Sequence, residues 1–332
     1  MKSVQLHDLV YGEVLLSDPL VIDLYHSQAV QRLASIYQGG ITAFIRTERT
    51  ITRMEHSVGV MALLQRLGAD VPEQAAGLIH DVPHTAFSHV IDFVFPNHEH
   101  TYHESHREAF IQTTDLPAIV SRYGVDWRWL SEAENFSLLE RPLPTLCADR
   151  LDYFLRDGLS LGYLSRAAVD DVLAHLQAWD GMIVVTDIGV ARRLGDAFIA
   201  EDKGIWCAVQ EVGWYAVMAR ALRAALEGEL LAEHELWGTD QAILERLRAA
   251  GHPEVQRWLA LLRPEVTFTR VEQSPDMVVL PKVRAVDPPV LIEGQVRPLS
   301  QIDAGFAQRR QAYVESKQGE WGLAISDGRP RI

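Results

Sequence analysis

The sequence has little that suits a secreted, membrane-bound or nucleic-acid-binding protein. Its 332 residues include two cysteines, Cys147 and Cys207, which cannot form a disulfide framework. No apolar run approaches the roughly 20 residues of a membrane span, and residues 1–17 carry charged side chains where a signal peptide needs an apolar core. With 31 Lys and Arg against 45 Asp and Glu, the net charge of −14 argues against a nucleic-acid surface. We expect a cytoplasmic protein without membrane contact that meets any anionic ligand locally.

The sequence also lacks internal repeats, low-complexity tracts and Ser/Gly linkers, so tethered independent domains are not expected. Partial alternation over residues 4–16 predicts a short hairpin. Helical spacing of apolar residues predicts one helix or two short ones from Pro19 to Ile36, and further helices over 54–64, 74–80, 103–114, 145–158, 167–178, 205–232 and 240–262. β-branched runs predict strands at 182–185, 266–271, 277–286 and 290–296. These patterns indicate a mainly α fold, a helical bundle with a small C-terminal α+β extension.

What the sequence has in excess is histidine within one segment. Of 13 histidines, seven fall within residues 80–106, where even spreading would place about one: His80, His84, His89, His98, His100, His103 and His106. His80 and Asp81 follow the apolar helical stretch 75–79, where both side chains would be buried and need a partner. A divalent metal is one such partner, because imidazole nitrogen with carboxylate oxygen suits Mn, Fe or Zn.

Other polar residues on neighbouring helices strengthen this interpretation. His56 lies on the preceding predicted helix and Asp149 on a later one, so packed helices can bring them to the same point as His80. Pro83 predicts a turn that directs His84 and His89 toward the same cavity. The competing interpretation is a buried polar cluster without a metal.

The order of these motifs resembles a known family. The segments that carry the resemblance are Arg53–Val60, His80-Asp81 with His84, Phe87–His89, Asp92, Tyr102–Glu104 and Asp149–Asp157. They are similar to the HD-domain phosphohydrolases, in the branch of the deoxynucleoside triphosphate triphosphohydrolases (dGTPase-like and sterile-alpha-motif and HD-domain proteins). The resemblance extends from about residue 7 to about residue 165. It implies an HD core over residues 1–165, hairpin included, with residues 166–332 packed on it and not independent.

The resemblance also implies roles for individual residues. The implied metal ligands are His56, His80, Asp81 and Asp149. The implied catalytic residues are His84, His89, Asp92 and His103, with His89 acting at phosphorus or the leaving oxygen and Asp92 paired with His103. The implied substrate-binding residues are Arg53 in the phosphate path and Arg150, Tyr153 and Asp157 at phosphate and sugar. The cofactor would be one divalent ion (Mn, Fe, Zn, Ni or Mg), with a second Mg beside the substrate phosphates as an option, and the family often forms homo-oligomers.

Each of these residues also has an alternative interpretation in which its role is purely structural. His84, His89, Asp92 and His103 would otherwise hold supporting or surface positions, and Arg150 and Arg156 would pair with helix acids. His98, His100 and His106 fit no motif. Helical spacing places the aromatic residues Trp206, Trp214 and Tyr215 in the core.

The resemblance implies hydrolysis of a deoxynucleoside triphosphate to nucleoside and triphosphate. One departure from the family pattern weakens the prediction of a triphosphate substrate. The basic residues that would hold a triphosphate near 200–204 are limited to Arg192, Arg193 and Lys203. A 5′-nucleotidase, or a hydrolase of another small phosphoester, is therefore the alternative within the same chemistry. The alternative of another class is a regulator that binds a nucleotide and does not cleave it.

Overall fold

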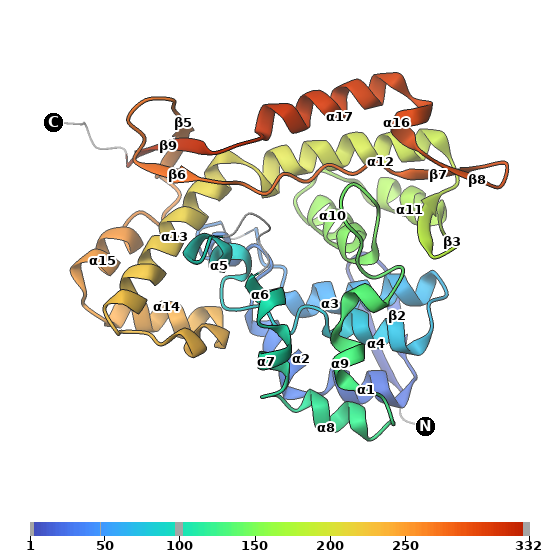
Figure 1. Cartoon of the computed structure of the whole chain (residues 1–332), viewed down its shortest axis with the longest axis horizontal. Helices are drawn as coiled ribbons and strands as arrows, with labels where there is room; N and C mark the ends of the chain where they lie inside the picture. The colour runs from blue at the N-terminus through green and yellow to red at the C-terminus, as the bar shows by residue number, and fades with distance from the viewer. Residues whose placement is uncertain (1–2, 47, 97–101, 328–332) are drawn as a thin grey trace.

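The N-terminal residues of the protein form the predicted hairpin (Figure 1). The computed structural model describes residues 3–46, 48–96 and 102–327. Strands β1 (Val4–Asp8) and β2 (Gly12–Leu16) pair antiparallel, with Val4 opposite Leu16. Gly12 takes a φ of 72° at the turn, a conformation that L side chains rarely adopt.

The next helices carry the first of the predicted ligands. They are α1 (Pro19–Tyr25), α2 (Gln28–Arg32), α3 (Arg53–Arg66) and α4 (Val71–Ile79), with 3-10 turns η1 (Leu33–Ser35) and η2 (Gly40–Phe44) between α2 and α3. The pattern from Pro19 thus gives two short helices rather than one. Thr52 caps α3 in a capping box with Glu55, which fixes the start of the helix just before His56. Helix α3 packs against α4 and against α10 (Ala148–Ser160).

The chain after α4 turns instead of continuing as a helix, as Pro83 predicts. It then runs through η3 (Ser88–Val90), α5 (Ile91–Val94), α6 (Tyr102–Ser105), α7 (Arg107–Ile111), α8 (Leu116–Ser121), α9 (Trp127–Ser131) and η4 (Ala133–Asn135). The helix predicted over 103–114 is therefore two short helices, α6 and α7. Of these short helices, α8 packs against α1, and α9 packs against α4 and α8.

The second half of the chain is helical with two small sheets. Its helices are α11 (Arg166–Ala174), α12 (Ile188–Glu201), the π-helix η5 (Asp202–Trp206), α13 (Val209–Glu227), η6 (Glu233–Trp237), α14 (Asp240–Ala249), α15 (Pro253–Leu259), α16 (Leu299–Ile302) and α17 (Ala304–Lys317). The sequence pattern missed α12. Its Gly195 is a packing glycine, not a helix breaker: a Cβ there would lie 2.5 Å from the ring of Phe306 on α17.

Two separate sheets close the C-terminal part. One has the order β3 (Leu176–Trp179), β4 (Met182–Val185), β7 (Pro289–Ile292), β8 (Gln295–Pro298), and the other the order β5 (Thr267–Arg270), β9 (Trp321–Ser326), β6 (Met277–Val279). The strand predicted over 277–286 is wrong beyond β6. Residues 280–288 instead form an irregular segment that joins the two sheets and passes along α12 in Figure 1, and we call it the β6–β7 connector.

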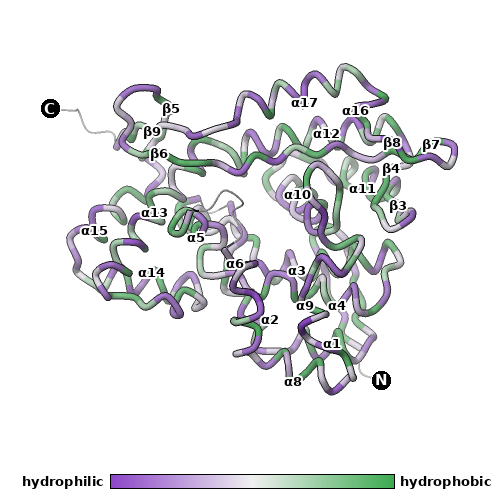
Figure 2. The backbone as a smooth tube through the Cα atoms, in the orientation of Figure 1, coloured by the Kyte–Doolittle hydropathy of each residue, from purple (hydrophilic) through white to green (hydrophobic). Residues whose placement is uncertain are grey.

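Buried apolar residues form two clusters. The first joins α3, α4, α10 and α12, and includes residues as far apart as Val10 and Phe306. The second surrounds α13 and the sheet of β5, β9 and β6. Hydrophobic and hydrophilic residues alternate along the helices, as amphipathic packing requires (Figure 2). Among the described residues, none of the helices combines the length and the apolar character that crossing a bilayer takes.

Candidate active site

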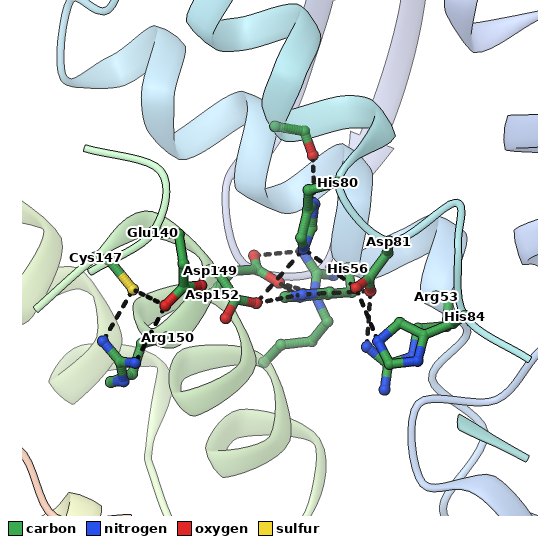
Figure 3. A network of polar contacts seen from close by, with 12 residues as sticks. Arg53, His56, His80, Asp81, His84, Glu140, Cys147, Asp149, Arg150 and Asp152 are labelled. Atoms are coloured by element: carbon green, nitrogen blue, oxygen red, sulfur yellow. Dashed lines mark hydrogen bonds and ion pairs between the residues drawn. The ribbon is translucent and has the colours of Figure 1, made fainter. Parts of the chain in front are cut away.

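Three helices bring the four predicted metal ligands to one point (Figure 3). His56 lies in α3, His80 and Asp81 directly follow α4, and Asp149 lies in the first turn of α10. The ligand atoms of His56, His80 and Asp81 lie within 4.8 Å of one another. Asp149 Oδ1 is 2.9 Å from His56 Nε2 and 3.5 Å from His80 Nε2. The structure thus assembles the residues that the sequence pattern only lists in order.

Hydrogen bonds behind the two imidazoles fix which nitrogen faces this point. His56 Nδ1 lies 2.8 Å from the Asp152 carboxylate, and His80 Nδ1 lies 2.7 Å from the carbonyl oxygen of Gly77. Both partners only accept hydrogen bonds, so each Nδ1 carries the hydrogen. The Nε2 atom of each neutral ring therefore presents a lone pair to the carboxylates of Asp81 and Asp149.

This arrangement fits a divalent cation. His80 Nε2 is buried without a hydrogen-bond partner in the described part of the chain, and the carboxylate oxygens of Asp81 and Asp149 lie 3.4 and 3.5 Å away. A lone pair that faces carboxylates in a buried place is unfavourable unless positive charge lies between them. A proton supplies that charge in the metal-free protein: although burial opposes it, hydrogen bonds to Asp149 and Asp152 raise the pKa of His56 to about 10. Metal binding would release this proton.

The partner of His56 is itself held by a buried ion pair. Arg156 lies 2.9 Å from Asp152 and, through the same guanidinium, 2.9 Å from Asp8 of the N-terminal hairpin. A Cβ at position 59 would lie 1.9 Å from the Arg156 guanidinium, which explains Gly59 on α3. The hairpin therefore contributes to the site by fixing the orientation of the ligand His56. Arg156 pairs with acidic residues, as its purely structural interpretation predicts.

Asp81 is held on its outer side by two further predicted residues. Arg53 Nη1 lies 2.8 Å from Asp81 Oδ2 and its Nε donates to Ser88, while His84 Nε2 lies 3.2 Å from Asp81 Oδ1. Although burial opposes it, Arg53 and His80 hold the pKa of Asp81 well below its ordinary value. Burial and the charge of Arg53 lower the pKa of His84 to about 3, so this ring is neutral.

The remaining predicted catalytic residues form a second group beside the ligands. His89 Nδ1 lies 3.0 Å from Asp92 Oδ2, and Asp92 also accepts from the backbone of Tyr102. His103 stacks on His84 with ring centroids 3.9 Å apart. Asp92 therefore hydrogen-bonds to His89 and not to His103, whose Nδ1 has no hydrogen-bond partner among the described residues, and the implied acid–base pairing of Asp92 with His103 stays a prediction.

Of the predicted substrate-binding residues, Arg150 is the most constrained. Its guanidinium donates to the carbonyls of Thr145 and Arg141 and lies 3.3 Å from Glu140. This arginine holds the loop before α10 in place. Among these loop residues, Glu140 and Cys147 lie beside Asp149 as a second potential group of metal ligands.

Tyr153 and Asp157 lie one and two helical turns after Asp149 in α10, on the same face of the helix. The Tyr153 ring packs edge-on against Trp206 with centroids 4.8 Å apart, and Asp157 accepts a 2.8 Å hydrogen bond from the Trp206 indole. Burial raises the pKa of Asp157. The π-helix that holds Trp206 thus forms a wall beside these two residues.

Every residue predicted for the metal, for catalysis and for substrate lines one cavity of about 440 Å³. That volume is in the range of pockets that hold a small organic ligand. The aromatic prediction is partly wrong: Trp206 and Tyr215 line the cavity, and only Trp214 is a core residue. Of the histidines without a motif, His106 stacks on Tyr102, while His98 and His100 lie outside the described residues.

Most of the cations that line the cavity are not among the predicted substrate-binding residues, of which only Arg53 and Arg150 are cations. Arg192, Arg193 and Lys203 are not among the lining residues, and the two arginines pair with Asp303 and Asp171. The cations that line the cavity are Arg49, Arg53, Arg107, Arg141, Arg150, Lys282 and Arg284. A weak signal for the last two was present: basic and apolar residues alternate in 281–284, as in an extended segment with one polar face.

Comparison with known proteins agrees with this geometry. The family described as "HD domain" matches residues 53–157, which hold all four predicted ligands, and HD domains bind divalent metals. The metal-dependent phosphohydrolase cns2 of Cordyceps militaris is 36% identical over 326 residues, covering 95% of this chain and 94% of that protein. The human deoxynucleoside triphosphate triphosphohydrolase SAMHD1 is 26% identical over 208 residues, covering 47% of this chain and 33% of that protein.

The fold agrees as well. The crystal structure of a phosphohydrolase from Bacteroides thetaiotaomicron matches with a TM-score of 0.68 at 18% identity, covering 96% of this chain and 99% of that one. The near full-length match to cns2 shows that the similarity includes the C-terminal half and is not confined to residues 53–157. This protein belongs to the HD-domain family of metal-dependent phosphohydrolases.

Proposed function

We propose that this phosphohydrolase acts on a nucleotide, and that its substrate is a deoxynucleoside triphosphate cleaved to nucleoside and triphosphate. One observation carries the proposal. One cavity, large enough for a nucleotide, is lined by three groups of residues. They are the ligand cluster (His56, His80, Asp81 and Asp149), the hydrogen-bonded pair His89 and Asp92, and several Lys and Arg side chains. The partial similarity to human SAMHD1, whose name states this reaction, supports the same substrate class.

The ligand residues prepare the site for chemistry at phosphorus. A bound divalent cation lowers the pKa of water toward about 7 and neutralises phosphoryl charge. Asp152 and Gly77 keep the Nε2 atoms of the ligand histidines aimed at the cation position. Arg53 holds Asp81 in place through an ion pair, and its positive charge also lines the cavity in which the substrate phosphate would bind.

His89 is the residue placed to move a proton. Its Nδ1 is fixed by Asp92, so Nε2 is the atom available to the cavity. Burial and the charge of Arg53 hold the pKa of His89 well below its ordinary value, so the ring is neutral in the free protein. A bound phosphate adds negative charge nearby, which favours the protonated ring that a departing alkoxide needs.

The alternative within the same chemistry is a 5′-nucleotidase. It is favoured by the pairing of the cations nearest the ligands, since Arg53 pairs with Asp81 and Arg150 with Glu140. Little unpaired positive charge then remains beside the metal position. A monophosphate needs less positive charge than a triphosphate, so this arrangement suits a single phosphate group.

The test is product identification. Metal-loaded protein is incubated with deoxynucleoside mono-, di- and triphosphates, and chromatography separates triphosphate from orthophosphate. Triphosphate with free nucleoside supports the proposal, and orthophosphate released only from monophosphates supports the nucleotidase. Binding without any product would favour the regulator, and the proposal would then be abandoned.

A further inference from the structure

Two cations of the β6–β7 connector, Lys282 and Arg284, line the cavity without forming an ion pair among the described residues. Among the described residues, no carboxylate lies within ion-pair distance of Lys282 or Arg284. Within residues 3–46, 48–96 and 102–327, the Arg284 guanidinium has one hydrogen bond, to the carbonyl of Lys282 at 3.3 Å. Burial and the neighbouring Arg284 lower the pKa of Lys282, although the more distant carboxylates of Glu104, Asp92 and Glu140 act in the opposite direction.

The other cations of the cavity are already engaged. Arg49, Arg53, Arg107 and Arg150 each pair with a carboxylate, at 3.0, 2.8, 3.0 and 3.3 Å respectively. Arg141 directs its guanidinium to the carbonyls of Ser137 and Gly181. Among the described residues, the cavity cations without an ion pair are therefore Lys282 and Arg284 on the connector and Arg141, whose guanidinium is held by these carbonyls.

The connector is held firmly in this position. The Arg284 backbone donates to Asp202 of the π-helix at 2.9 Å, and the same carboxylate accepts from Tyr313 at 2.8 Å. Arg310 donates to the two carbonyls that follow Arg284, at positions 285 and 286, whose side chains are buried. Two cations on a fixed backbone form a preorganised anion site, because little order is lost when the anion binds.

The position of these cations relative to the catalytic residues defines what they can hold. Both Lys282 and Arg284 act electrostatically on His89, and Lys282 also on Asp92. They therefore stand close to the proton-transfer residue, on an element that contributes no metal ligand. Because the ligand cluster and the connector line the same cavity, an anion with more than one phosphate group can contact both at once.

We propose that Lys282 and Arg284 form a second anion subsite, which binds the non-reacting phosphates of a nucleoside polyphosphate while its reacting phosphate meets the metal. This inference rests on the proposed nucleotide substrate. It assigns to the C-terminal half the distinction between polyphosphate and monophosphate substrates.

The experiment uses metal-loaded full-length protein in excess Mg²⁺. Calorimetry compares the affinity for inorganic tripolyphosphate with that for orthophosphate in Lys282→Gln/Arg284→Gln, in the charge-preserving Lys282→Arg/Arg284→Lys, and in Arg193→Gln as a matched surface control. Loss of two charged contacts is expected to weaken tripolyphosphate binding by about tenfold or more and to leave orthophosphate binding within about twofold. The charge-preserving variant and the control should bind tripolyphosphate as the wild type does.

The outcomes separate the subsite from the substrate proposal. Equal weakening for tripolyphosphate and orthophosphate, or no weakening for either, overturns the subsite even if the protein hydrolyses nucleotides. Selective weakening supports the subsite even if no nucleotide is turned over, in which case only the proposed substrate fails. Steady-state kinetics gives a second measurement: the glutamine variant should raise KM for a deoxynucleoside triphosphate far more than for the monophosphate.

Discussion

The ligand cluster and the β6–β7 connector differ in whether their charged side chains form ion pairs. Around His56 and Asp81, buried charges are balanced by partners such as Asp152 and Arg53. On the connector, Lys282 and Arg284 form no ion pair among the described residues, and carboxylates act on Lys282 only from a greater distance. A cluster that balances its own charges can hold a metal with fixed geometry, whereas cations without an ion pair are available to a charged group of the substrate. We infer that the two regions divide the chemistry from the recognition of substrate.

The largest effect is expected from removing two ligands. His80→Ala/Asp81→Ala should abolish stoichiometric metal binding and reduce hydrolysis by more than the roughly 100-fold that follows loss of a ligand's hydrogen-bond partner. Elemental analysis and a phosphate-release assay measure both. His106→Ala, from the same histidine-rich segment but not a cavity residue, is the control and should keep its metal. Equal metal content in the double variant and the wild type would contradict the assignment.

The next effect concerns proton transfer without loss of metal. His89→Gln should lower kcat by a factor of about 10² to 10⁴, the usual contribution of a positioned acid or base. Metal content should stay at the wild-type value, because His89 hydrogen-bonds to Asp92 and not to a predicted ligand. A loss of metal in this variant would place His89 in the cluster, and a loss of activity below tenfold would remove its proposed role.

A smaller effect is expected behind the cluster. Asp152→Asn keeps the side-chain shape but removes the charge that supports His56, and should weaken metal affinity by about 10- to 100-fold. Competition with a chelator measures the affinity. Asp240→Asn is the matched control, since Asp240 is equally buried but accepts only from the backbone of Tyr37 and Phe87. Similar weakening in both variants would show a general effect of buried charge.

The smallest effect tests the contact between the two halves of the chain. Glu201 on α12 is fully buried, and its oxygens have no hydrogen-bond partner among the residues that the structure describes. Burial together with Asp157 raises the pKa of Glu201 to about 10. The folded protein therefore keeps a proton that the unfolded chain releases above about 4.5, so stability falls as pH rises from there toward 10. Glu201→Gln should remove this part of the pH dependence.

Thermal denaturation across that pH range measures the effect. The variant should match the wild type at the acidic end and exceed its Tm at the alkaline end, with a difference that grows as pH rises between these limits. Parallel curves for the two proteins at all pH values would show that Glu201 is not the group responsible.

The sequence predicted the cluster well because the chemistry restricts the residue types. A site for a divalent cation needs imidazole and carboxylate, so His56, His80-Asp81 and Asp149 stand out where they interrupt apolar helical patterns. The hairpin and the turn at Pro83 follow from local backbone preferences in the same way. These features depend on a few residues that are close in sequence or held by regular helices.

The connector could not be found in this way. Lys282 and Arg284 are ordinary in type, and their approach to the cavity depends on Asp202, Arg310 and the placement of two sheets. The β-branched character of residues 277–286 predicted a strand throughout, whereas prolines and these tertiary contacts keep 280–288 irregular. The pairing of Asp92 with His89 likewise depends on the turn geometry of η3 and α5, which the spacing alone does not determine.

The most direct test of the account is the product formed from a deoxynucleoside triphosphate by metal-loaded wild-type protein. A metal cluster with a polyphosphate subsite beside it predicts free deoxynucleoside and intact triphosphate in equal amounts, resolved by anion-exchange chromatography. Stepwise release of orthophosphate, or turnover of monophosphates alone, would contradict it.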